Sequence, residues 1–266
     1  MPTININGND IYYEDQGPKD APALVLSHSL FFDHRMFVNQ AKAFPPQNLR
    51  VVCYDHRDQG RSGRSAESPV SMDSLADDAV DLIDALDLSP CYFAGSSMGG
   101  FIALRLAARR PDLLRGCIVM ASSAEPEYSF DELHPLVEGI RAEGTAAYID
   151  QLMYIMFGDD TLANPGMAEV REFWKSHMLS LEPDIARTAD GVIRRQGVLD
   201  ELQDCTVPLL LLPGAQDHAY PPQLSENILD VVENGEMVTI AGAGQSLALE
   251  QPAKVNSHIL EFINNT

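Results

Sequence analysis

Apolar residues along the chain gather in short runs that are separated by longer stretches of helical periodicity. The runs are bounded by Gly, Pro, Asn and Asp, and the central ones are almost wholly apolar, which is typical of strands covered on both faces. Predicted strands occupy residues 4–6, 11–14, 23–27, 51–54, 91–95, 117–120, 208–212 and 237–240. The pattern therefore predicts a sheet of eight strands.

Helical patterns lie between most of these runs. Residues 72–88 place apolar side chains on one helical face and aspartates on the other, with Ser71 as the expected N-cap. A second helix is predicted over residues 98–110, and the last one begins at Pro252. Two initial strands followed by alternating strands and helices predict an α/β fold, with a mostly parallel sheet flanked by helices.

The strand signal disappears between residues 124 and 202, where apolar positions recur at helical spacing. A helical block inserted between two strands of such a sheet belongs at the carboxyl edge of the strands, where α/β proteins bind ligands. The expected organisation is a core formed by residues 1–123 and 203–266, with a helical cap formed by residues 124–202.

Charge narrows the range of partners. The chain has 266 residues and a net charge of −21, which argues against nucleic acid because phosphate binding needs a basic surface. The same charge disfavours anionic membranes. Only four of the 18 basic residues are lysines, against 39 acids, which resembles the surfaces of salt-adapted proteins. A homodimer is compatible with these patterns, which do not determine the oligomeric state.

Location and metal content can be judged from what the sequence lacks. No apolar run approaches the roughly 20 residues of a membrane span, and the N-terminus lacks the features of a secretory signal, so we expect a cytoplasmic protein. The four cysteines have no C-x-x-C spacing, which favours reduced packing residues over disulfides. No His, Asp or Glu cluster shows ligand spacing, so no metal is expected.

Residues 91–102, CYFAGSSMGGFI, contain the motif that carries chemistry. An apolar strand runs into G-S-S-M-G and then into a predicted helix, which is the setting that gives the pattern G-x-S-x-G its meaning. The tight turn exposes the hydroxyl of Ser97 and needs small residues beside it. Because Met98 begins the helix, its N–H can face a developing oxyanion.

With this motif in place, the sequence resembles the α/β-hydrolase family, in particular small serine hydrolases similar to 3-oxoadipate enol-lactonases and cofactor-free carboxylesterases. The resemblance runs from the first hairpin to the final helix. Besides the serine turn, it rests on residues 24–30 (LVLSHSL), 54–62 (YDHRDQGRS) and 212–217 (LPGAQD). These blocks are specific for the fold and much less so for the substrate.

The resemblance implies roles for several residues and no cofactor. The N–H of Leu30 would be the second oxyanion donor, and His28 would brace that loop. Asp217 matches the acid that orients a catalytic histidine. Arg57 and Arg61 are expected to anchor their loop.

The family's catalytic histidine follows the last strand, and Gln245 occupies that place in this chain. An amide can donate and accept hydrogen bonds but cannot take the serine proton near neutral pH, so turnover should be strongly impaired. Three explanations stay open. The change is a deliberate His-to-Gln substitution, or the chain is a natural relative that binds a ligand without hydrolysis, or His218 or His28 acts as a substitute base.

The implied substrate is a small, largely apolar ester or lactone, bound between Ser97 and the cap. Phe31, Tyr154, Phe157 and Trp174 are expected to contact it. Carboxylated lactones would need a cation near the pocket. Carbon-carbon hydrolases and perhydrolases share the serine turn and remain alternatives. The remaining histidines are expected to be solvated or to cap helices: His34, His56, His134, His177 and His258.

Overall fold

The computed structural model describes residues 2–66 and 70–266, which form one sheet of eight strands in the order β1-β2-β4-β3-β5-β6-β7-β8. The two N-terminal strands pair antiparallel and the others run parallel, which confirms the predicted α/β fold. The strands are β1 (Thr3–Ile6), β2 (Asn9–Gln16), β3 (Ala23–Ser27), β4 (Arg50–Tyr54), β5 (Cys91–Ser96), β6 (Leu114–Met120), β7 (Leu209–Leu212) and β8 (Gly235–Met237).

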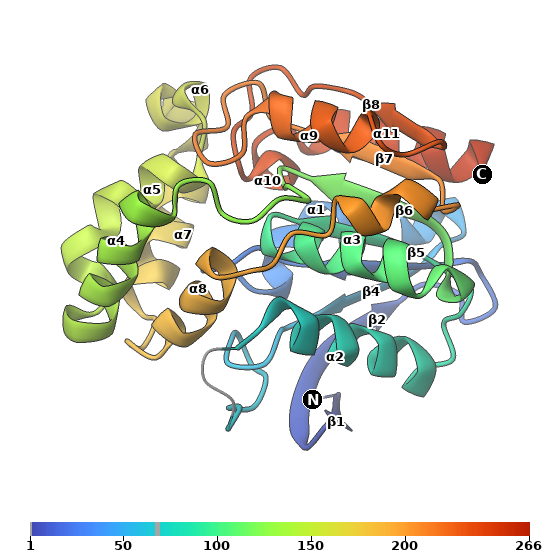
Figure 1. The fold of residues 1–266 in the computed structure, drawn as a ribbon, viewed down its shortest axis with the longest axis horizontal. Coiled ribbons are helices and arrows are strands. Elements are labelled where there is room, and N and C mark those ends of the chain that lie inside the picture. Colours follow the sequence, from blue (N-terminus) through green and yellow to red (C-terminus); the bar gives the residue numbers. More distant parts are fainter. Residues whose placement is uncertain (1, 67–69) are drawn as a thin grey trace.

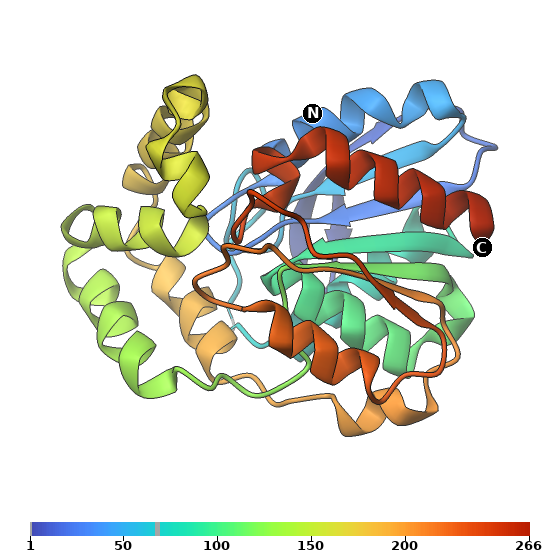
Figure 2. The ribbon, with the colours of Figure 1, turned by 90° about the horizontal axis from the view of Figure 1, so that it is seen from above.

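Helices cover both faces of the sheet. Figure 2 shows α1 and α11 on one face, with α3 and α9 on the other. The helices of this body are α1 (Val38–Ala43), α2 (Met72–Ala85), α3 (Met98–Arg109), α9 (Pro222–Leu229), α10 (Leu247–Glu250) and α11 (Pro252–Asn265). Short 3-10 helices cover His34–Phe37, Pro45–Gln47, Pro111–Leu113, Thr145–Tyr148, Pro165–Met167 and Asp200–Asp204.

The chain between β6 and β7 is helical. Figure 1 shows this group at one side of the molecule, beyond one end of the sheet. Its members are α4 (Phe130–Glu143), α5 (Ile149–Met156), α6 (Asp159–Ala163), α7 (Ala168–Leu179) and α8 (Ile185–Ile193). We propose that residues 124–202 act as a cap over a core made of residues 1–123 and 203–266.

The expected N-cap of α2 is present, and several element ends shift; β6, for example, begins at Leu114 instead of residue 117. The Ser71 side chain accepts a hydrogen bond from the N–H of Ser74 at 3.0 Å, which confirms the expected N-cap of α2. The last strand covers Gly235–Met237 instead of residues 237–240. Its partner β7 runs into Pro213, which has no N–H to continue the ladder, and only an isolated bridge between Gly214 and Ile240 follows.

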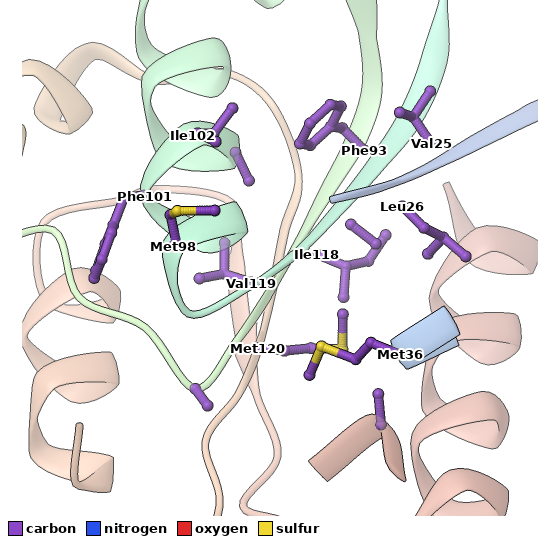
Figure 3. Packing of buried hydrophobic residues seen from close by; sticks show 14 of the residues in the cluster. Val25, Leu26, Met36, Phe93, Met98, Phe101, Ile102, Ile118, Val119 and Met120 are labelled. Atoms are coloured by element: carbon purple, nitrogen blue, oxygen red, sulfur yellow. The ribbon is translucent and has the colours of Figure 1, made fainter. Parts of the chain in front are cut away.

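Glycines let α3 approach the sheet closely. A Cβ on Gly99 would lie 2.0 Å from the carbonyl oxygen of Ser27 in β3, and one on Gly95 would lie 2.0 Å from the carbonyl oxygen of Gly99. Figure 3 shows Met98 and Ile102 of α3 within the packed apolar interior beside β5 and β6. Because these glycines have no side chain, the first turn of α3 can pack directly against the sheet.

Replacing Gly99 with alanine should lower the free energy of unfolding by about 1–3 kcal/mol, because the new methyl group would overlap a backbone carbonyl that cannot move freely. Urea unfolding followed by circular dichroism measures the change. Gly166→Ala is the control, since the nearest atom to its Cβ is the Asn164 side-chain oxygen at 3.2 Å, and it should stay within about 0.5 kcal/mol. Equal midpoints for the two variants would contradict the packing argument.

Candidate active site

Ser97 lies at the turn between β5 and α3 with a strained backbone. Its φ of 52° and ψ of −110° place an L residue in a region that is costly without support. Support comes from hydrogen bonds on both sides, because the N–H of Ser97 donates to Met120 at 2.8 Å and the hydroxyl of Ser122 donates to the Ser97 carbonyl at 2.9 Å. The side chain thus lies at the carboxyl edge of the sheet.

Gln245 lies between the two other predicted triad positions. Its amide oxygen accepts from Ser97 Oγ at 2.6 Å, and its amide nitrogen donates to Asp217 at 2.9 Å (Oδ1) and 2.6 Å (Oδ2). This orientation of the amide is favoured because the opposite one would turn the amide oxygen toward two carboxylate oxygens. Three residues that are distant in sequence therefore form one continuous line of hydrogen bonds.

Asp217 is held from the other side by its own loop. The N–H groups of Ala219 and Tyr220 donate to Oδ1 at 2.8 and 2.9 Å. Burial, with a smaller contribution from the negative charge of Glu250, raises the pKa of the Asp217 carboxyl to about 7, while the two N–H donors act in the opposite direction. The carboxylate is thus fixed in place but has no cationic partner in this line.

The two N–H groups expected to form an oxyanion hole belong to Met98 and Leu30. Met98 is the first residue of α3, so its N–H has no acceptor within the helix, and Leu30 lines the same cavity as Ser97. Within residues 2–66 and 70–266, neither N–H donates to a protein acceptor. Phe31, the next residue, has a φ of 69°, a strained value that shapes this loop.

A cavity of about 260 Å³ opens beside Ser97 and Gln245. Of the four predicted contact residues, Phe31 and Tyr154 line it. Phe157 and Trp174 do not, because their rings pack against Phe32 with centroids 6.2 and 4.6 Å away. The sequence could not separate the two pairs, since all four lie in apolar patterns.

Much of the cavity wall comes from residues that were not singled out in the sequence. Helices α4 and α8 each supply an apolar face of the wall, and Glu127 and Tyr220 complete it near the loop of Asp217. These residues are Leu133, Leu136, Val137, Ile140, Ala189, Val192, Ile193, Glu127 and Tyr220. The helical periodicity of α4 indicated an apolar face, but it did not show whether that face lines a cavity or packs against another helix.

Neither candidate for a substitute base is hydrogen-bonded to Ser97, although His218 lines the same cavity. The His28 ring is fully buried, with Nδ1 2.8 Å from the carbonyl oxygen of Ser29 and Nε2 accepting from the N–H of His56 at 3.1 Å. Burial also lowers the pKa of His28. The His218 ring has Nδ1 2.7 Å from the carbonyl oxygen of Tyr154 and Nε2 3.2 Å from Asp159. Both rings therefore have each nitrogen engaged elsewhere.

His34 and His56 were expected to be solvated or to cap helices; both are buried, and His34 lies at the start of a 3-10 helix. His34 also belongs to a group with Asp33 and Asp55 whose ligand atoms are close enough to hold a metal ion. Spacing along the sequence did not reveal this group, since Asp55 follows β4 whereas Asp33 and His34 lie in the segment after β3. His34 Nδ1 lies 2.8 Å from Asp55, and hydrogen bonds from Arg35, acting against burial, lower the pKa of Asp33 to about 2. These groups thus already have protein partners.

The loop that carries Arg57 and Arg61 is held by these side chains, as expected. Arg57 forms a buried ion pair with Asp78 of α2, with Nε donating to Oδ2 at 2.6 Å. Arg61 donates to the hydroxyl of Tyr12 at 2.8 Å and lies over its ring.

Among the described residues, no helix combines the length and the apolar character required to cross a membrane.

Comparison with known proteins places this geometry in a family. RutD of Pseudomonas syringae pv. syringae, provisionally named a carbamate hydrolase, is 25% identical over 92% of this chain and 95% of its own length. Carboxylesterase YbfK of Bacillus subtilis is 29% identical over 93% of this chain and 82% of its own length. The solved enol-lactonase of Burkholderia xenovorans LB400 shares the fold, with a TM-score of 0.92, 24% identity, and coverage of 99% of this chain and 100% of that one.

The model of the alpha/beta hydrolase family matches residues 24–258, which include the serine turn, the acid loop and the loop of Gln245. The chain therefore belongs to the alpha/beta hydrolase family.

Proposed function

We propose that this chain is the scaffold of a serine hydrolase for small, neutral esters or lactones, with turnover strongly impaired because Gln245 occupies the position of the general base. The observation that carries the proposal is the line from Ser97 Oγ through the Gln245 amide to Asp217. A carboxylesterase and an enol-lactonase among the similar proteins support the ester or lactone class. The family membership itself leaves the substrate open.

The mechanism follows from where each group lies. Ser97 Oγ would attack the substrate carbonyl, and the N–H groups of Leu30 and Met98 would donate to the oxyanion that forms. A histidine at position 245 would accept the serine proton, and Asp217 would stabilise the resulting cation. The amide oxygen of Gln245 accepts the same hydrogen bond but cannot bind the proton, so the nucleophile stays a neutral hydroxyl.

The charges around the cavity support a neutral substrate. No Lys or Arg lines the cavity within the described part of the chain, and its carboxylates are Glu127 and Glu132. Glu127 is buried and already accepts from Arg195 at 2.7 Å and from the Tyr220 hydroxyl at 2.8 Å. A carboxylate on the substrate would therefore be desolvated without a cation to pair with it.

The two cationic residues of the cap between Tyr154 and Leu181 do not change this charge balance. Arg171 donates at 2.6 Å to the carbonyl oxygens of Thr161 and Asn164, and Lys175 lies 3.4 Å from Asp150. Neither side chain lines the cavity. Carboxylated lactones thus fit this cavity less well than neutral ones.

A second candidate is a protein that binds a small lactone without hydrolysing it. The apolar cavity beside Ser97 supports this reading, since a ligand site would need the cavity but no base. The two candidates differ at one residue. Only a hydrolase scaffold should become active when position 245 can accept a proton.

Gln245→His should raise kcat on short p-nitrophenyl esters by about 10³-fold or more, because the family base is worth on the order of 10⁴ to 10⁶ in turnover. Initial rates at pH 8 measure the change, and Gln245→His combined with Ser97→Ala is the control for non-specific hydrolysis. If Gln245→His gains no activity while a small lactone still raises the melting temperature, the ligand-binding candidate is correct.

In the Gln245→His protein, a neutral alkyl lactone should give a kcat/KM at least about 10-fold above that of a lactone of similar size with one carboxylate, because the anion loses hydration without gaining a cation. Competition assays at low ionic strength compare the two substrates directly. Glu132→Lys, at an exposed position on the cavity wall, should narrow the difference. Preference for the anionic lactone in the parent would contradict the neutral assignment.

Asp217→Asn should stabilise the Gln245 protein at pH 8 and have little effect at pH 4. A carboxyl whose pKa is about 7 when folded and near 3.8 when unfolded holds its proton more tightly in the native state, so it destabilises the fold progressively as pH rises from 4 to 7. Removing the charge should raise the free energy of unfolding by up to roughly 2–4 kcal/mol at pH 8, reduced by the two hydrogen bonds that the Gln245 amide donates to the carboxylate.

Urea unfolding at half-unit pH intervals gives this difference between variant and parent. Asp20→Asn, at an exposed turn, is the control and should give a difference that does not change with pH. An Asp217→Asn difference that is equally flat would show that the carboxylate carries no burial penalty.

A further inference from the structure

A second buried carboxylate holds the loop that presents residue 245. Oε1 of Glu250 accepts from the N–H of Gly244 at 3.0 Å and from the N–H of Ser246 at 3.0 Å, one on each side of Gln245. Oε2 accepts from the N–H of Gly158 at 2.9 Å. Glu250 is 6% exposed, so these bonds are shielded from water.

Gly158, whose N–H donates to Oε2 of Glu250, lies in the chain between α5 and α6. Gly158 is buried and has no room for a side chain, because a Cβ there would lie 2.7 Å from the N of Gly244 and 2.9 Å from the Gln216 side-chain oxygen. Two residues later, the N–H of Asp160 donates to that same Gln216 oxygen at 2.9 Å. Residues 158–160 therefore contact the loops of both Gln245 and Asp217.

The two loops are also joined to each other. The N–H of Gln216 donates to the carbonyl oxygen of Ala243 at 2.8 Å. A displacement of either loop would thus be passed to the other. Glu250 is the acceptor for both N–H groups that flank Gln245, which would be buried without a partner if Glu250 were absent.

We infer that Glu250 is a positioning residue, which fixes residue 245 against Ser97 and couples that position to residues 158–160 of the helical insertion. This inference rests on the proposed function. Glu250 is not itself in contact with Ser97, so it acts through the loop. A shift of about 1 Å in a catalytic group can reduce turnover about 100-fold, whereas substrate binding in the cavity depends on other residues.

The kinetic test uses Gln245→His as the parent. Glu250→Ala should lower kcat about 100-fold with KM changed less than about threefold, and Glu250→Gln, which keeps one acceptor oxygen for Gly244 and Ser246, should lower it only about 10-fold. Asp78→Asn is the matched control, because it also removes a buried carboxylate, bonded to Arg57 and away from Ser97, and should leave kcat within about twofold. A kcat unchanged by Glu250→Ala would overturn the inference.

A second measurement needs no turnover and uses the chain with Gln245. In Glu250→Ala, amide hydrogen exchange at Gly158, Gly244 and Ser246 should accelerate at least about 10-fold, while the amides of β5 keep their protection. Retained protection at these three amides, or equal acceleration across the molecule, would overturn the inference. Inactivity of Gln245→His would instead count against the proposed function and would leave this exchange result standing.

Discussion

The line of hydrogen bonds from Ser97 through the amide of Gln245 to Asp217 is the interaction on which the rest of the site depends. It joins three loops at the carboxyl edge of the sheet, and each loop is fixed by a different device. Glycines bring the first turn of α3 against β3, backbone N–H groups hold Asp217, and Glu250 holds the loop of Gln245. A short, buried line of this kind tolerates little displacement.

The electrostatics of the line suit a cation better than the neutral amide that occupies it. Burial raises the pKa of Asp217, and the nearby charge of Glu250 raises it further. An imidazolium at position 245 would neutralise this excess of negative charge, whereas an amide only donates hydrogen bonds to it. The surroundings of residue 245 thus agree with the proposal that the site is organised for a histidine. They also make the buried carboxylate a cost to stability near neutral pH.

Sequence patterns predicted the fold and Ser97 because local constraints specify them, whereas Asp217 and Gln245 were assigned by resemblance to the family. The serine turn needs Gly95 and Gly99, and the position of Gln245 follows from its place after the last strand. The cavity wall was harder to predict. Helical periodicity shows that α4 has an apolar face, but long-range packing decides whether that face meets the cavity or another helix. Phe157 and Trp174 illustrate the error, since their apolar rings pack against Phe32.

The central claim is that Ser97 is correctly placed for attack and lacks only a proton acceptor. Labelling by a fluorophosphonate probe tests it most directly, because the probe reacts with an activated serine and needs no knowledge of the substrate. We expect Gln245→His to be labelled at least about 100-fold faster than the chain with Gln245, with the label on Ser97 by peptide mass spectrometry. Equal labelling rates for the two proteins, or a label on another residue, would contradict the account.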